Sequence, residues 1–185
     1  MAKNHDILND RQEIRLNEDG LQIRYATVND IADIQNLLRI TWHHTYDNIL
    51  GPEKVIAISK LWHSHERLEN DITNPDCHFL VMNDKTEIFA TVYVRYQGND
   101  VILGRMYVHP NRQGKGYGSE LMQAIISAVQ LRHGQRISLT VEPRNQNSIR
   151  FYEKLGFKII GTGSCSEVPY DGDPTLIMVR ESVSE

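Results

Sequence analysis

The sequence has 185 residues, of which 40% are hydrophobic and 24% are charged, so its length and composition fit one globular domain of ordinary size. The formal net charge is -4, and this mildly acidic balance argues against a dedicated nucleic-acid-binding protein. No apolar run is long enough to cross a bilayer, the start does not resemble a signal peptide, and two cysteines cannot form a disulfide framework. We therefore expect a cytoplasmic domain that binds neither nucleic acid nor a membrane.

The first part of the chain divides into a polar segment and the beginning of a domain. Residues 1–20 are polar and of mixed charge, so we predict an N-terminal extension there and a domain over 21–185. Residues 21–25 alternate between apolar and polar side chains, which predicts a strand. Thr27 and Asp30 have the spacing of a capping box, and apolar residues at helical spacing follow them.

Hydrophobic periodicity divides the rest of the chain into further helices and strands, since a period near 3.6 predicts a helix and a period of 2 a strand. The expected segments are, in chain order, a helix to residue 42, a helix from 52, helical turns over 64–71, strands over 78–82, 86–96 and 101–108, a helix from 118, a strand over 136–141, a helix over 145–155, and strands over 157–161 and 175–180. In short form the order is βααβββαβαββ, which is a mixed α/β layer architecture.

A glycine-rich segment, residues 113–118, lies between the third of these central strands and the next helix. Closely spaced glycines let successive backbone amides turn toward one anion, and the start of a helix adds unpaired amides and a positive dipole end. Residues 105–118 contain three basic side chains and no acidic one. The segment therefore predicts a phosphate or pyrophosphate site, although its spacing fits neither a P-loop nor a dinucleotide-binding fingerprint.

Two motifs resemble those of the GNAT superfamily of N-acetyltransferases. Gln113, Gly116 and Gly118 match the acyl-CoA-binding pattern Gln/Arg-x-x-Gly-x-Gly/Ala. The second pattern, an asparagine followed by an aromatic pair and Gly-Phe, is matched by Asn147, Phe151-Tyr152 and Gly156-Phe157. The resemblance extends over residues 21 to 180. It implies an acetyl-CoA-dependent N-acetyltransferase whose central sheet is mostly antiparallel, splayed and flanked by helices.

The resemblance also implies roles for individual residues. Met106, Tyr107 and Val108 would contact the pantetheine arm and the thioester, with an amide near Val108 polarising the acetyl carbonyl. Tyr152 would protonate the departing thiolate and Asn147 would contact pantetheine; packing on a short helix and a helix cap are the alternative roles of these two residues. The residues that would wrap the pyrophosphate are Gln113, Gly114, Lys115, Gly116, Tyr117, Gly118 and Ser119.

The substrate amine must also lose a proton, and for a lysine-like ammonium at pH 7 this costs roughly 4–5 kcal/mol. Many GNAT relatives carry a glutamate on the strand before the loop, whereas residues 103–106 of this chain contain no carboxylate. Glu142 and water relayed by backbone carbonyls are the two candidates for the base. The candidates for the acceptor pocket implied by the fold are Trp42, Tyr46 and Tyr93, with His43, His44, Tyr96, Tyr170, Asp171 and Asp173 as further candidates.

The resemblance predicts transfer of an acetyl group from acetyl-CoA to a primary amine of a small molecule or a protein by direct attack. The alternative is a non-catalytic acyl-CoA sensor or interaction module on the same fold. No metal is expected, because the eight histidines lack the spacing of a ligand set. Formation of a homodimer is left open.

Overall fold

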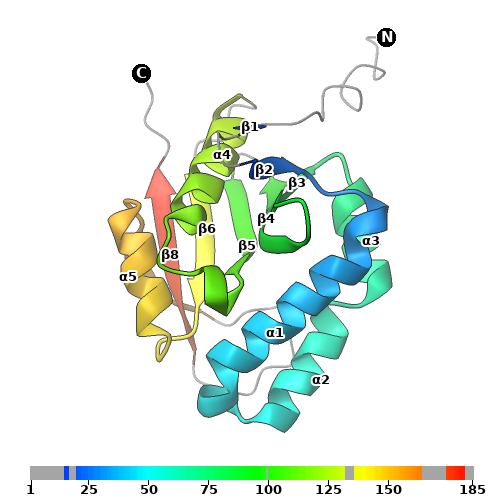
Figure 1. Cartoon of the computed structure of the whole chain (residues 1–185). Coiled ribbons are helices and arrows are strands. Elements are labelled where there is room, and N and C mark those ends of the chain that lie inside the picture. Colours follow the sequence, from blue (N-terminus) through cyan, green and yellow to red (C-terminus); the bar gives the residue numbers. More distant parts are fainter. Residues whose placement is uncertain (1–14, 17–19, 99, 132–135, 164–173, 182–185) are drawn as a thin grey trace.

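The computed structural model describes residues 15–16, 20–98, 100–131, 136–163 and 174–181 (Figure 1). The elements are, in chain order, β1 (Arg15–Leu16), β2 (Gln22–Tyr25), α1 (Ile31–Leu50), α2 (Pro52–Trp62), α3 (His65–Thr73), β3 (Cys77–Asn83), β4 (Ile88–Gln97), β5 (Asp100–Val108), α4 (Tyr117–Leu131), β6 (Arg136–Val141), α5 (Gln146–Lys154), β7 (Lys158–Gly163) and β8 (Thr175–Glu181), with short 3-10 helices over Val28–Asp30 and Pro110–Arg112. None of the helices in these ranges is long and apolar enough to cross a membrane.

Within these ranges, eight strands form one sheet in the order β1-β2-β3-β4-β5-β6-β8-β7. Every neighbouring pair is antiparallel except β5 and β6, which are parallel. The pairing of β5 with β6 covers only residues 100–102 and 136–138, although both strands continue beyond it. The two strands therefore part in the middle of the sheet, and the mostly antiparallel, splayed sheet implied by the resemblance is confirmed.

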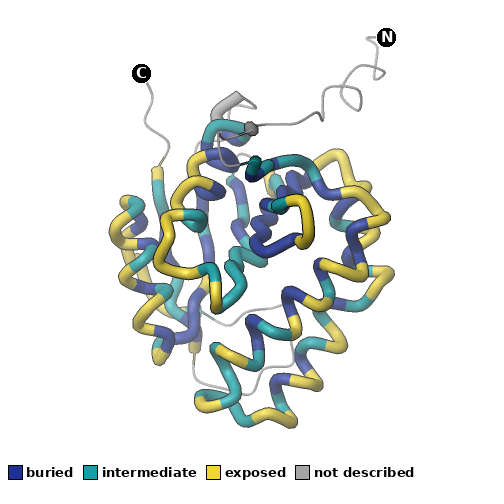
Figure 2. Tube along the Cα trace, in the orientation of Figure 1, coloured by how far each residue is buried: buried dark blue, intermediate teal, exposed yellow. Residues whose placement is uncertain are grey.

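Helices cover both faces of the sheet (Figure 1). Strand β3 has apolar side chains on both of its faces, and each face needs a helical layer to bury it. Leu80 and Met82 pack in one core with α4 and α5. The alternate residues Phe79 and Val81 pack in a second core with α1 and α3. Both faces of this strand are apolar, and all four of these side chains are buried. Figure 2 shows the buried positions concentrated on the strands and on the inward sides of the helices.

Helix α1 is longer than the sequence predicts. It was expected to end near Trp42 but continues to Leu50, where Gly51 has a φ of 86° and ends it. Trp42, Tyr46 and Leu50 lie in one apolar cluster with residues of α2, so tertiary packing maintains the helix through a polar stretch. The two additional turns carry side chains that line the cavities beside β5.

Two other segments also differ from the predicted order. The helical turns expected over 64–71 form an independent helix, α3, whose N-cap Ser64 accepts a hydrogen bond from the N–H of Arg67. Arg15–Leu16, inside the predicted extension, pairs with β2 as a two-residue edge strand. The remaining expected strands and helices are present, with boundaries shifted by a few residues.

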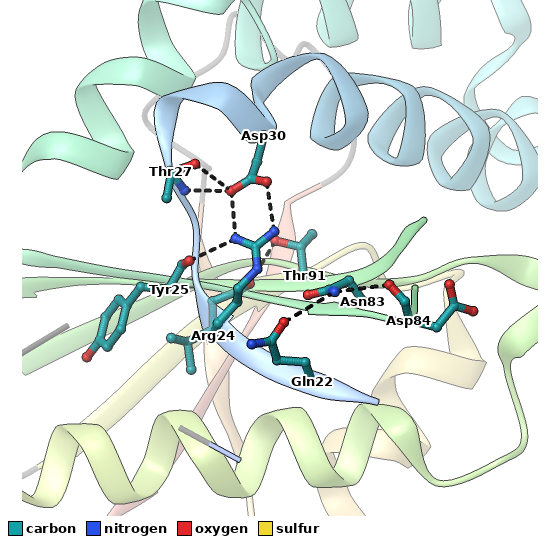
Figure 3. A network of polar contacts seen from close by, with 9 residues as sticks. Gln22, Arg24, Tyr25, Thr27, Asp30, Asn83, Asp84 and Thr91 are labelled. Carbon is teal, nitrogen blue, oxygen red and sulfur yellow. Dashed lines mark hydrogen bonds and ion pairs between the residues drawn. The ribbon is translucent and has the colours of Figure 1, made fainter. Parts of the chain in front are cut away.

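A compact polar network joins β2 to the start of α1 (Figure 3). Both terminal nitrogens of Arg24 donate to the carboxylate of Asp30 at 2.8 Å. The same carboxylate accepts from the N–H of Thr27 at 2.7 Å and from its hydroxyl at 3.0 Å. The capping box predicted for Thr27 and Asp30 is therefore present, and an arginine from the neighbouring strand reinforces it.

Candidate active site

The parting of β5 from β6 turns main-chain groups of β5 toward open space. The N–H of His109 donates to the carbonyl of Phe89 on β4 at 2.8 Å. In an antiparallel ladder only alternate residues bond to the same neighbour, so the N–H and C=O of Val108 face away from β4 and toward β6. The Val108 carbonyl accepts a hydrogen bond from Gln113 Nε2 at 3.0 Å.

Two cavities meet at this point. An outer cavity of about 660 Å³ lies between the glycine-rich loop and α5, and an inner cavity of about 140 Å³ lies between the parted strands and α1. The residues that line both are Thr45, Met106, Val108, Gln113, Asn145, Ser148 and Tyr152. A molecule in the outer cavity can therefore present one end to the inner cavity beside Val108 and Tyr152.

The glycine-rich loop has the geometry of an anion cradle. Gly114 and Gly116 have φ values of 76° and 89°, in the left-handed region that favours glycine, and a Cβ on either would meet no atom within 4 Å. At Gly118 a Cβ would lie 3.3 Å from the ring of Phe151, so the absence of a side chain lets α5 approach the start of α4. The loop can therefore expose its amides and the first turn of α4 to the outer cavity.

The charges around the outer cavity suit an anion as well. Its basic lining residues are His44, Arg112, Arg144 and Lys154, and none of the described residues that line either cavity is acidic. Together with the loop amides, this lining fits the pyrophosphate and phosphate groups of coenzyme A. A cosubstrate of that kind would bring a thioester toward the junction of the cavities.

The turn between β3 and β4 anchors the loop. Arg112 Nη2 donates to Asp84 Oδ2 at 2.7 Å and to Glu87 Oε1 at 3.1 Å. Hydrogen bonds from the hydroxyl and N–H of Thr86, with a further contribution from the Arg112 charge, lower the pKa of Asp84 to about 2. The Asp84 carboxylate is therefore ionised at neutral pH and can hold Arg112 in place.

Tyr152 lies on α5 with only 9% of its surface exposed. Its ring packs against Phe151 and Phe157 at centroid distances of 5.3 and 5.6 Å. Burial, with a smaller contribution from Tyr46, raises the pKa of Tyr152 above that of an ordinary phenol. The hydroxyl therefore keeps its proton at physiological pH, and the side chain lines both cavities.

Two other tyrosines line the inner cavity. Asn145 Nδ2 donates to the hydroxyl of Tyr46 at 3.4 Å. Burial raises the pKa of Tyr46, the hydrogen bond from Asn145 opposes this, and the charge of Glu142 adds to it. Burial beside Tyr46 and Tyr152 also raises the pKa of Tyr107. The inner cavity therefore has neutral hydroxyl groups on several sides.

Comparison with known proteins now identifies the family. Residues 34–157, more than half of the chain, match the model of the Acetyltransferase (GNAT) family. The chain belongs to this family. An uncharacterised N-acetyltransferase of Mycobacterium tuberculosis is 29% identical over 72% of this chain and 86% of its own length. The spermidine N(1)-acetyltransferase of Thermoplasma acidophilum is 25% identical over 77% of this chain and 91% of its own length.

The fold is also similar to that of a solved N-acetyltransferase structure. The crystal structure of a PaiA N-acetyltransferase from Thermoplasma acidophilum in complex with coenzyme A has a TM-score of 0.78 to this structure, at 23% identity, over 88% of this chain and 99% of that one. The family and the named relatives support an acetyltransferase enzyme and not the sensor module considered as the alternative.

Most of the residues that match the two GNAT motifs line the outer cavity. The predicted loop residues line it, except for Lys115, which is exposed and outside the lining. Asn147 lines the cavity, and its Oδ1 accepts from Arg150 at 2.8 Å. Asn145 is the N-cap of α5 and accepts from the N–H of Ser148. The helix-cap role considered for Asn147 therefore belongs to Asn145.

Five other predicted site residues lie outside the lining of both cavities, namely Glu142, Trp42, Tyr93, His43 and Tyr96. Glu142 is 7% exposed, and its Oε1 accepts from Arg144 Nε at 2.7 Å. Trp42 is buried where α1 meets α2. Tyr93 is buried in the core with α1 and α3, and its hydroxyl donates to Asp71 at 3.1 Å. The candidates Tyr170, Asp171 and Asp173, like Cys165, lie outside the described residues.

Several lining residues were missed from the sequence. Thr41 and Thr45 lie one turn apart on α1, but the predicted end of that helix at residue 42 hid this pattern. Arg144 Nη1 donates to the carbonyl of Ile49 at 3.1 Å and thereby links the loop after β6 to the end of α1. Arg105 also lines the inner cavity, and the isolated Gly104 before it is a typical signal of a bulge in a strand.

Proposed function

We propose that this enzyme transfers an acetyl group from acetyl-CoA to the terminal primary amine of a small, unbranched substrate, with polyamines as the first class to test. The observation that carries the proposal is the junction of the two cavities. There, the main chain of Val108 faces the gap between β5 and β6, and the side chain of Tyr152 lines both cavities. An electrophile and a nucleophile that enter from the two cavities would meet between an amide donor and a phenol.

The outer cavity would bind acetyl-CoA. Amides of the Gly114–Gly118 segment and the first turn of α4 would bind the pyrophosphate, and Asn147 would contact the pantetheine arm. The acetyl group would then reach the junction. The N–H of Val108 faces the gap at this junction, and this orientation supports a role as an oxyanion donor to the acetyl oxygen.

The chemical step would be direct attack. The amine nitrogen forms a bond to the acetyl carbon, and the bond from that carbon to sulfur breaks. The leaving thiolate takes the proton of the Tyr152 hydroxyl, which is neutral at pH 7 as an ordinary phenol is. The Tyr152 phenolate then recovers a proton from solvent, and the amine loses its own proton separately, so that the products are the amide and the free thiol.

The amine proton would leave through the inner cavity. Tyr46 lines this cavity, and Glu142 is near enough for its charge to raise the pKa of Tyr46. Because Glu142 is paired with Arg144 and lies outside the lining, we do not place it in contact with the amine. We propose instead that water and the Tyr46 hydroxyl link the amine to Glu142.

The size of the inner cavity supports an unbranched acceptor. Its volume is about 140 Å³, against about 660 Å³ for the outer cavity. That space suits an amine on a methylene chain better than a bulky ring or a branched carbon. Spermidine is the first acceptor to test, since a relative that matches 77% of this chain is named as a spermidine acetyltransferase.

An acceptor panel tests the proposal. Thiol release from acetyl-CoA should be measured with spermidine, an unbranched diamine, an α-branched amine, an aminoglycoside and a peptide with a free N-terminus. We expect release with the first two and at least tenfold lower kcat/KM for the branched amine. A preference for the peptide or the aminoglycoside would contradict the proposed acceptor class, and release without any amine would contradict amine transfer.

A further inference from the structure

Strand β5 carries an irregularity just before the site. Tyr93 of β4 lies opposite Gly104, but Thr91, two residues away, lies opposite Tyr107, three residues from Gly104. One extra residue is therefore accommodated in β5, as in a β-bulge. Arg105 lies in this bulge with a φ of 45°, and it is the single non-glycine residue of the described ranges with a positive φ.

The extra residue decides which way Val108 faces. The N–H of Tyr96 donates to the carbonyl of Asp76 on the β3 side of β4, so alternation turns the main chain of Tyr93 toward Gly104 on β5. In a regular strand, Val108 would face β4 as Gly104 does, because the two are four residues apart. The bulge reverses this alternation, and Val108 faces the gap instead.

The side chain of Arg105 is held from several directions. Its Nη1 lies 2.6 Å from Asp71 Oδ2 on α3, and its Nη2 donates to the carbonyl of Trp62, the last residue of α2, at 3.0 Å. The guanidinium also lies over the ring of Tyr93, 5.0 Å from its centroid. Both partners of the ion pair are largely shielded from water, with 11% and 18% of their side chains exposed.

Asp71 and Tyr93 complete this arrangement. The hydroxyl of Tyr93 donates to Asp71 Oδ1 at 3.1 Å. A Cβ on Gly104 would lie 3.4 Å from Cδ1 of the same ring, so Tyr93 packs directly against the backbone that enters the bulge. Side chains from α3 and β4 thus hold Arg105 in a backbone conformation that is unfavourable for a residue with a side chain.

We propose that Arg105 is a positioning residue: its clamp on Asp71 and on the Trp62 carbonyl maintains the bulge that turns the Val108 N–H toward the reacting carbonyl. This inference rests on the proposed role of Val108 as the oxyanion donor. It assigns a function to a residue of the stretch 103–106, in which this chain has no carboxylate.

The test compares turnover, acetyl-CoA affinity and amide hydrogen exchange in variants of the full chain. We expect Arg105→Ala and Asp71→Asn to lower kcat about tenfold or more, since outright removal of an oxyanion donor lowers it by about 10²–10³. The Kd for acetyl-CoA, which depends on the glycine loop, should stay within about threefold. Exchange in segment 104–108 should rise. The double variant should lose little more than either single one, because both changes release the same clamp.

Conservative variants and a matched control keep the test decisive if Arg105→Ala folds poorly. Arg105→Lys retains one contact to Asp71 and should fall between wild type and alanine, and Arg105→Gly permits the positive φ and should be less impaired than alanine. Asp30→Asn breaks a comparably shielded ion pair in the α1 cap and should leave kcat and exchange in 104–108 unchanged.

Two results would overturn the proposal. One is wild-type turnover and exchange in Arg105→Ala. The other is an Asp71→Asn variant whose readouts match those of Asp30→Asn, because the ion pair would then act on stability alone. A wild-type chain that transfers no acetyl group would contradict the proposed function, and the exchange measurement would still decide whether the clamp maintains the bulge.

Discussion

At the scale of single residues, Tyr152 is the group on which the proposed chemistry depends most. We predict that Tyr152→Phe lowers kcat about 10²-fold, because general acid catalysis typically contributes 10²–10⁴-fold, while the Kd for acetyl-CoA changes little. Steady-state kinetics and calorimetry check both parts. Tyr25→Phe removes a hydroxyl that bonds His78 at 2.7 Å, outside both cavity linings, and should leave kcat unchanged. Full turnover in Tyr152→Phe would return the residue to a packing role.

The raised pKa of Tyr152 has a further consequence for pH dependence. A phenol whose pKa lies above its ordinary value of 10 keeps its proton to a higher pH than a free tyrosine does. Ionisation of Tyr152 should therefore cause no loss of rate below about pH 10. Steady-state measurement of kcat at increasing alkaline pH checks this expectation.

Glu142 has a testable role at the same scale. If it receives the amine proton through Tyr46, Glu142→Gln should lower kcat more at pH 7 than at pH 9, since more of the amine arrives deprotonated at the higher pH. Pre-steady-state measurement of the acetyl-transfer step at both values checks this. Glu153→Gln, an exposed change on α5, is the control. Equal losses at both pH values would contradict the proposed route.

His63 predicts how stability depends on pH. Burial, with the charges of Arg105 and Arg67, lowers its pKa from 6.5 to about 3. Between these values the unfolded chain binds the proton and the folded chain does not, so the free energy of unfolding falls as pH falls, by about 1 kcal/mol per unit from this group. His63→Gln should remove this part of the slope in denaturant titrations from pH 7 to 5. The exposed His65→Gln should retain it, and an unchanged slope in His63→Gln would contradict the assignment.

The sequence predicted the positions of the motif residues better than those of the candidates for the acceptor pocket. Val108, Gln113 and Tyr152 all lie at the junction of the cavities, because the spacing of a motif along one strand, loop or helix determines their relative positions. Tyr93 lies elsewhere. Its side chain faces the core with α1 and α3, and only the register of β4 against its neighbours decides that orientation.

At the scale of elements, the glycine-rich loop gives the clearest prediction. Gly116→Ala places a side chain at a φ of 89°, so the loop must leave its conformation or hold about 1–2 kcal/mol of strain. We expect the Kd for acetyl-CoA to rise about tenfold in calorimetric titrations. Gly161→Ala, on β7, adds a Cβ in open space with an ordinary backbone conformation and should leave affinity unchanged. Equal affinities of the two variants would show that the loop conformation does not matter for binding.

Element boundaries explain why Tyr46 was predicted for the acceptor pocket but the neighbouring Thr41 and Thr45, which also line the inner cavity, were not. The polar residues after Trp42 interrupt the apolar periodicity of α1, whereas packing against α2 carries the helix on to Leu50. Tyr46 therefore projects from a regular helix and not from a loop. The bulge in β5 was missed for a similar reason, because Arg105 needs partners on α2 and α3 that are distant in the sequence.

At the scale of the whole molecule, the average charge conceals a local division. The formal net charge of the chain is -4, yet the described residues that line the outer cavity include Arg112, Arg144 and Lys154 and no acidic side chain, with the carboxylates that pair with the two arginines outside the lining. An anionic cosubstrate is thus favoured locally in spite of the net charge, which is the effect expected of a cleft lined by one sign of charge. The homodimer that was left open stays a prediction.

The most direct test of the central claim is analysis of the products formed from acetyl-CoA, carrying a carbon-13 label in its acetyl carbonyl, and spermidine. We predict that the label appears as an amide on a terminal nitrogen of spermidine, with one thiol released for each amide formed. Label recovered as free acetate in place of the amide, or acetyl-CoA left unconsumed across the whole acceptor panel, would contradict the account.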